Sequence, residues 1–107
     1  MRKVLAVGCV LALVAAALAV PALAATKSIA LRDTFFSPKS MTVSKGTTVK
    51  WVWRGRLPHN VTVKSGPVKF RSKTQTTGSF SKRLTRAGTY RIVCTIHPGM
   101  NLTLKVK

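Results

Sequence analysis

The sequence predicts one small all-β domain, an antiparallel Greek-key sandwich of about seven short strands, preceded by a secretory signal peptide. Three observations support this prediction. Apolar and polar residues alternate with a period of two, turn-forming residues separate the alternating stretches, and no stretch beyond position 25 has a useful length of helical periodicity. With 107 residues, the chain has room for one domain at most.

The first 24 residues have the parts of a signal peptide. A positively charged start is followed by small and apolar residues over positions 4–20, and positions 22–24 then read Ala-Leu-Ala, which suits a signal peptidase. We therefore expect residues 1–24 to be removed on export and residues 25–107 to form the mature domain. An uncleaved membrane anchor is the alternative, but the apolar run is slightly short for a spanning helix.

The expected strands follow one another along the mature chain, each with one apolar face and one polar, usually cationic face. Their alternating residues lie at 29–31, 41–43, 49–53, 61–63, 80–84, 90–94 and 102–106. Turn chemistry separates them at 44–46, 54–58, 65–67, 77–78 and 86–88. Two sheets built from such strands would share one core between their inner faces.

The charge of the chain narrows its possible functions. It has 19 Lys and Arg residues against one acid, Asp33, which gives a formal net charge of +18. A lone carboxylate excludes paired-carboxylate hydrolysis and calcium or magnesium sites built from carboxylates. Loss of residues 1–24 removes two cations and leaves +16. Specific binding of nucleic acid is not expected, because we expect the chain to be exported and it shows no groove-reading helix or stacked aromatic platform.

The soft and imidazole side chains gather in two short segments. The mature chain keeps one thiol, Cys94, which cannot form an intrachain disulfide. Positions 94–100 read Cys-Thr-Ile-His-Pro-Gly-Met, so His97 and Met100 follow closely, and His59 lies 35 positions before Cys94. One thiolate and two imidazoles can form a trigonal copper site, which a thioether approaches along its axis.

Each of these residues also has an ordinary explanation. Alone, Cys94 would be an inert buried thiol, either histidine a loop residue, and Met100 a core side chain. Their joint arrangement favours a soft-metal site instead, and zinc would fit the same donors less selectively. Trp51 and Trp53 share one strand face and are most simply core residues.

Most of the mature chain, residues 36–106, resembles the plastocyanin-type blue copper proteins of the cupredoxin family. The ligand loop is most similar to that of the amicyanin-like members, and the Pro-His-Asn-Val piece is nearer to plastocyanin. The matching pieces are 36–38, Gly46 before the strand at 49–51, 57–61, 88–90 and 94–100.

The resemblance implies one type 1 copper ion, with His59, Cys94 and His97 as equatorial ligands and Met100 as the axial ligand. It also implies that Asn60, beside a ligand, ties the two ligand loops together. A role for Asn60 as an ordinary strand-entry residue is the alternative.

From the resemblance we expect a secreted or periplasmic one-electron carrier, and not an enzyme. Four protein ligands leave no open position for a substrate, and the Cys-His spacing matches a ligand loop better than a nucleophile with its base. The expected electron port and docking surface consist of His97, Pro98, Pro58, Leu57, Arg54 and Arg56. The two arginines would steer an acidic redox partner towards the port.

Two other functions are compatible with the sequence. The same four ligands could sequester or deliver periplasmic copper, or the protein could be a metal-free cationic binding module. In each case we expect a monomer in the periplasm or outside the cell, with weak contact to anionic lipid or polymer of the cell envelope.

Overall fold

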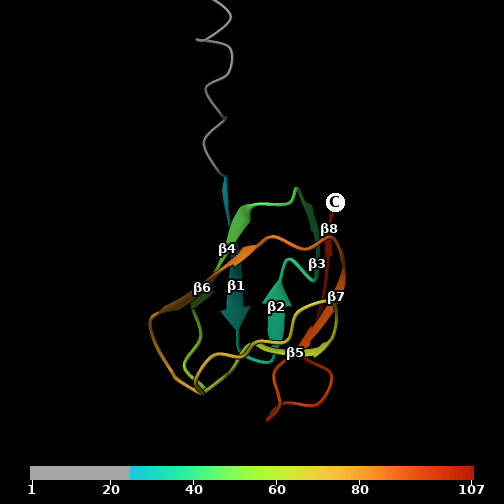
Figure 1. The fold of residues 1–107 in the computed structure, drawn as a ribbon. Helices are drawn as coiled ribbons and strands as arrows, with labels where there is room; N and C mark the ends of the chain where they lie inside the picture. The colour runs from blue at the N-terminus through green and yellow to red at the C-terminus, as the bar shows by residue number, and fades with distance from the viewer. Residues whose placement is uncertain (1–24) are drawn as a thin grey trace, which may run out of the picture.

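Eight strands and no helix occur in residues 25–107, the part of the chain that the computed structural model describes (Figure 1). The strands are β1 (Thr26–Arg32), β2 (Phe35–Ser37), β3 (Ser40–Val43), β4 (Thr47–Trp53), β5 (Thr62–Ser65), β6 (Ser79–Leu84), β7 (Gly88–Val93) and β8 (Asn101–Val106). The expected signal peptide, residues 1–24, lies outside the described residues, and its cleavage stays a prediction. In the described part, no helix is long and apolar enough to cross a membrane.

The strands form two four-stranded sheets, with the orders β2-β1-β4-β6 and β3-β8-β7-β5. This confirms the predicted all-β sandwich. Each sheet also contains one parallel pair, β1 with β4 and β3 with β8, and its other neighbours are antiparallel. The chain crosses to the second sheet after β2 and returns to the first after β3, so no hairpin joins the two strands of either parallel pair.

The short strand β2 was not predicted as a strand. It has three residues, of which only Phe36 is buried. Three residues are too few for a period of two to become visible, so the sequence showed a family motif at this place but no strand. The predicted weaker strand around Phe80 and Leu84 is β6.

Alternation determines which side chains fill the space between the sheets. In β7 and just after it, Tyr90, Ile92 and Cys94 are buried, whereas Arg91 points to solvent. The buried core consists of Ile29, Leu31, Phe36, Val43, Val49, Trp51, Trp53, Val61, Val63, Leu84, Tyr90, Ile92, Cys94, Met100, Leu102, Leu104 and Val106. Cys94 and Met100 thus belong to the packed core.

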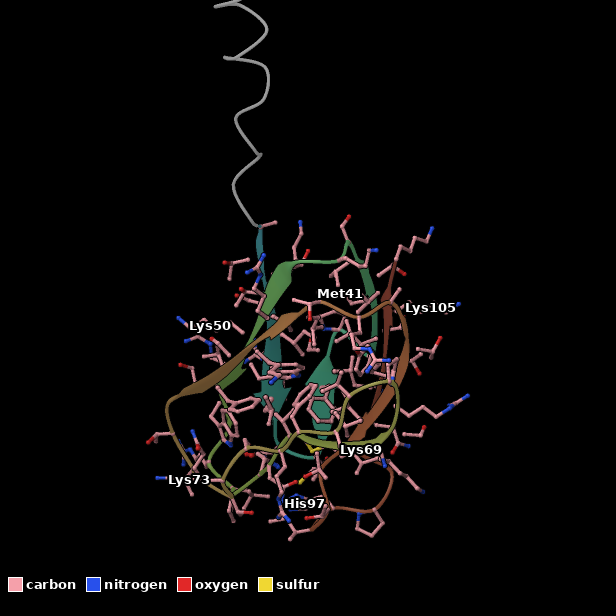
Figure 2. All side chains as sticks on the ribbon, viewed as in Figure 1. Met41, Lys50, Lys69, Lys73, His97 and Lys105 are labelled. Atoms are coloured by element: carbon pink, nitrogen blue, oxygen red, sulfur yellow. The ribbon has the colours of Figure 1, made fainter. Side chains whose placement is uncertain are left out.

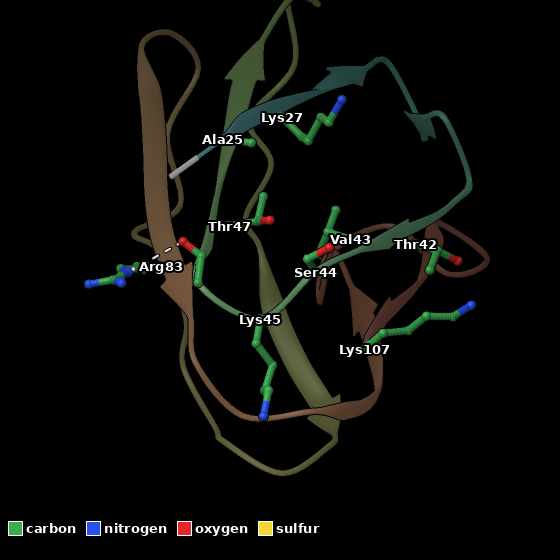
Figure 3. Close-up of a pocket in the computed structure, with 10 residues that line it drawn as sticks. Ala25, Lys27, Thr42, Val43, Ser44, Lys45, Thr47, Arg83 and Lys107 are labelled. Carbon is green, nitrogen blue, oxygen red and sulfur yellow. Dashed lines mark hydrogen bonds between the residues drawn. The ribbon is translucent and has the colours of Figure 1, made fainter. Parts of the chain in front are cut away.

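The two ends of the sandwich differ in character. The loop end carries the 94–100 loop, and Figure 2 shows His97 there, with Met41 and Lys105 nearer the opposite end. At the entry end, where the described chain begins at Ala25, a surface hollow is lined by residues 25, 27, 42–47, 83 and 107 (Figure 3). Four of these residues are cations, Lys27, Lys45, Arg83 and Lys107, and none is acidic.

Replacing Ile92 with Ala should destabilise the metal-free domain by about 2–5 kcal/mol, because the substitution leaves a cavity in a fully buried position. The neighbouring exposed Arg91→Ala variant is the control and should change the unfolding free energy by no more than about 0.5 kcal/mol. Urea unfolding of the two variants measures both values. Equal losses would contradict the assignment of faces in β7.

Candidate metal centre

Two loops at the loop end bring three metal-binding side chains together. His59 lies in the connection between β4 and β5, Cys94 directly follows β7, and His97 lies in the turn that leads to β8. The Nδ1 atoms of His59 and His97 are 3.1 Å apart. Cys94 Sγ is 3.5 Å from Nδ1 of His97 and 3.9 Å from Nδ1 of His59. The structure thus joins the distant histidine to the ligand loop, as the sequence predicted.

The two sulfur–nitrogen spacings, 3.5 and 3.9 Å, are close to those around a single metal ion, whereas the 3.1 Å between the two nitrogens is shorter. With bonds of about 2.0–2.1 Å to nitrogen and about 2.3 Å to sulfur, donors around a trigonal ion lie about 3.5–3.8 Å apart. The donor atoms of His59, Cys94 and His97 all lie within 4.8 Å of one another. Imidazole nitrogen and thiolate sulfur are donors that suit copper, and soft sulfur favours its reduced state.

The backbone of residues 94–100 folds into a closed turn that places both sulfur-bearing residues beside each other. The amide of Cys94 donates to the carbonyl of Met100 at 3.1 Å, and the amide of Met100 donates to the carbonyl of His97 at the same distance. Cys94 and Met100 are 3% and 1% exposed, and His59 is fully buried. Of the four side chains, His97 alone is partly exposed.

Asn60 connects the two loops through its side chain, which is fully buried. Its amide nitrogen donates to the hydroxyls of Thr74 and Thr95, at 3.0 and 2.8 Å. Its carbonyl oxygen accepts the backbone N–H of Thr95 and the hydroxyl of Thr62, at 3.1 and 2.8 Å. Both donors and both lone pairs of the amide are therefore used, and the residue after Cys94 is tied to the residue after His59.

The backbone of His59 is fixed from two further sides. Its carbonyl accepts hydrogen bonds from the indole N–H of Trp53 and from the amide of Gln75, both at 3.0 Å. Its own amide donates to the carbonyl of Gln75, also at 3.0 Å. Trp53, predicted only as a core residue, thus also holds the histidine loop.

The sequence did not assign Asp33 to the site. The carboxylate lies in the turn between β1 and β2, with Oδ1 3.1 Å from Nε2 of His59. It accepts the amides of Leu57 and Arg56, each at 3.0 Å. The hydrogen bonds from Leu57 and Arg56, and then the one from His59, lower the pKa of Asp33 from 3.8 to about 2. The only sequence signal was that a strongly basic chain keeps one acid.

Exposed apolar side chains adjoin the site residues. Leu57, two positions before His59, is 43% exposed, and Ile96, next to His97, is 46% exposed. Phe35, two positions after Asp33, is 41% exposed. The expected port residues Pro58 and Pro98 and both rim arginines, Arg54 and Arg56, are also exposed. Neither Ile96 nor Phe35 was among the expected port residues, because Ile96 lies in a turn and Phe35 in a strand of three residues, and neither segment is long enough to show alternation.

Comparison with known proteins agrees with this geometry. The model of the copper binding proteins of the plastocyanin/azurin family matches residues 24–107. The chain belongs to this copper-binding family. Within it, a solved structure of a reduced amicyanin variant is 27% identical, with a TM-score of 0.69 over 77% of this chain and 82% of that chain. No curated protein matches the sequence.

Two other solved structures show the same fold. A purple cupredoxin from Nitrosopumilus maritimus is 23% identical, with a TM-score of 0.68 over 76% of this chain and 99% of that chain. A copper-containing nitrite reductase from Thermus scotoductus SA-01 is 24% identical, with a TM-score of 0.67 over 82% of this chain but 23% of the reductase. The predicted resemblance to cupredoxins is confirmed, and copper is the cofactor that both family and donor set indicate.

In this cupredoxin, the side-chain carboxyl of Asp33 should titrate with a midpoint near pH 2, and near 3.8 when the chain is unfolded in urea. Because the folded pKa is the lower one, the carboxylate contributes stability above about pH 3.8 that is lost as the pH falls through 2. Carbon-13 NMR of the metal-free protein can follow this signal without overlap, because the chain has no other side-chain carboxyl group. A folded-state midpoint near 3.8 would contradict the hydrogen bonds described above.

Proposed function

We propose that this cupredoxin is an exported one-electron carrier that holds one copper ion through His59, Cys94, His97 and Met100. The convergence of three donor atoms within 4.8 Å, from loops 35 positions apart, is the observation that supports this proposal. When bound, copper supplies the Cu(II)/Cu(I) couple. The protein itself contributes a donor set that suits both oxidation states.

Residues around the proposed ligands hold the two ligand loops rigidly, and this rigidity is what the protein contributes to electron transfer. The fully used side-chain amide of Asn60 joins the loops, and Trp53 and Gln75 hold the backbone of His59. A donor cage that keeps its shape requires little rearrangement when the charge of the metal changes. Low rearrangement is what rapid electron exchange needs.

Burial of the donors favours an electron carrier over a protein that delivers copper. A protein that accepts copper must replace the ligands one by one, yet Cys94 and Met100 are 3% and 1% exposed and His59 is fully buried. An electron needs only contact with one edge of the site. The partly exposed ring of His97 offers that edge. Four protein ligands would also leave no open position for a substrate, which argues against an enzyme.

We propose that a redox partner docks on the surface around His97. The exposed side chains there are apolar, chiefly Pro98, Pro58, Leu57 and Ile96. Such a surface is easily desolvated on contact, which shortens the path from the partner to the imidazole. Arg54 and Arg56 are exposed beside it, so the complementary partner would carry acidic groups around its own port.

The opposite end of the molecule suits contact with the cell envelope. The hollow at the entry end carries four cations, and no acidic residue lines it (Figure 3). Weak binding of anionic lipid or polymer at this end would leave the surface around His97 free. It would also place the protein in the periplasm or outside the cell, as the predicted signal peptide requires. A monomer is sufficient for each of these contacts.

Mixing the purified domain 25–107 with Cu(II) should produce an intense visible absorption from the copper–thiolate bond, and Cys94→Ser should abolish it. Copper should also stabilise the wild type, by about 2.7 kcal/mol when free copper is 100 times the Kd. Visible spectra and thermal unfolding measure the two effects. A colourless wild type with unchanged stability would contradict copper binding at this site.

The reduced protein should react with hexacyanoferrate(III), an anionic oxidant, at a rate that falls with added salt. Arg54→Gln/Arg56→Gln should slow this reaction several-fold at low salt, because the removed charges lie beside the port. The control, Lys105→Gln/Lys107→Gln, has the same net charge as this variant. Its two cations are removed at the C-terminal end of β8, whereas Met100 directly precedes the first residue of that strand. Stopped-flow rates that fall equally in both variants would show that net charge alone acts, without a local rim.

A further inference from the structure

Asp33 occupies an unusual position in this chain. It is the one acid among 17 Lys and Arg residues in positions 25–107, and its side chain remains 38% exposed. Yet its carboxylate pairs with none of these cationic side chains in the described structure. Instead it binds the imidazole of His59 and two backbone amides of the loop just before that histidine.

The direction of the hydrogen bond to His59 follows from the chemistry of a carboxylate. An ionised carboxylate can only accept hydrogen bonds, so Nε2 of His59 must be the donor. In the neutral imidazole, the other nitrogen then keeps a free lone pair. That nitrogen is Nδ1, the atom that faces Sγ of Cys94 at 3.9 Å and Nδ1 of His97 at 3.1 Å. The carboxylate therefore selects the ring form that can bind metal at the site.

The loop that precedes His59 is shaped to receive this carboxylate. A side-chain carbon at Gly55 would lie 2.1 Å from Oδ1 of Asp33 and 2.6 Å from Cγ, much closer than nonbonded atoms can approach. Glycine at this position therefore permits the close contact. The amides of Arg56 and Leu57, directly after it, then both point at the carboxylate oxygens.

We propose that Asp33 is the positioning residue for the copper ligand His59, acting both on the ring and on the loop that carries it. The inference rests on the proposed ligand role of His59. The carboxylate fixes the protonated Nε2, holds residues 55–57 in place, and supplies the one negative side-chain charge near the metal. Hydrogen-bond partners of metal-binding histidines typically change metal affinity by about 10–100-fold when they are removed.

Three variants test the parts of this role. Asp33→Asn keeps the shape of the side chain but removes its charge, and Asp33→Ala removes every hydrogen bond. Gly55→Ala leaves the carboxylate in the chain but forces it away from the loop. Thr89→Lys is the control: it raises the net charge by one, as Asp33→Asn does, at an exposed position near the start of β7, remote from the Cys94 end of that strand.

In the metal-free wild type, nitrogen-15 NMR should show His59 with a hydrogen-bonded, slowly exchanging Nε2 proton and an unprotonated Nδ1. Protection of that proton should be lost in Asp33→Ala and reduced in Gly55→Ala, while the dispersion of backbone amide signals confirms folding. Thr89→Lys should match the wild type. An Nε2 proton that stays equally protected in all variants would overturn the proposal without any reference to copper.

Copper titration supplies the second readout. We expect Asp33→Asn, Asp33→Ala and Gly55→Ala to bind Cu(II) about 10–100-fold more weakly than the wild type. The reduction potential of Asp33→Asn should rise, because the lost negative charge had favoured Cu(II), and should rise more than that of Thr89→Lys. Unchanged affinity and a potential equal to that of Thr89→Lys would reduce Asp33 to a structural link in the loop. If the wild type itself binds no copper, the proposed function fails, whereas the NMR result still decides the role of Asp33.

Discussion

The fixed junction between two loops at one end of the sandwich is the constraint on which the site depends. Neither loop contains a full donor set, so their relative position must be specified by bonds between them. Asn60 provides these bonds with all four hydrogen-bonding positions of its amide, and its own side chain is fully buried. A buried amide that lost these partners would be strongly unfavourable, which makes the observed arrangement of the loops specific.

His59 is held by several hydrogen bonds, through both its backbone and its ring. The backbone carbonyl of this residue accepts from Trp53 and Gln75, and its ring binds Asp33. His97, by comparison, is held mainly by the turn of its own loop and reaches the surface. The two histidines therefore differ in position: His59 is fixed in the interior, and His97 reaches the surface.

Sequence patterns predicted most of the fold and the donor set, because both depend on local order. A period of two revealed seven of the eight strands, and the scarcity of thiol and imidazole groups singled out residues 59, 94 and 97. Contacts between residues far apart in the sequence produce no recognisable sequence pattern. Asp33 meets His59 across 26 positions, and Gly55 matters only because the carboxylate packs against it. Neither relation has a period or a spacing that a single sequence displays.

Uncompensated charge and exposed apolar residues have a combined effect at the loop end. Apolar side chains such as Leu57 and Ile96 would by themselves favour contact between two copies of the protein. Arg54 and Arg56 lie beside these side chains, so two copies would repel each other through their arginines. The only side-chain carboxylate that could pair with these arginines is Asp33, and its oxygens already accept hydrogen bonds. A partner with acidic groups around an apolar centre would remove the repulsion and bury the same side chains. On the proposed docking surface, the charge would thus turn a general apolar attraction into a selective one.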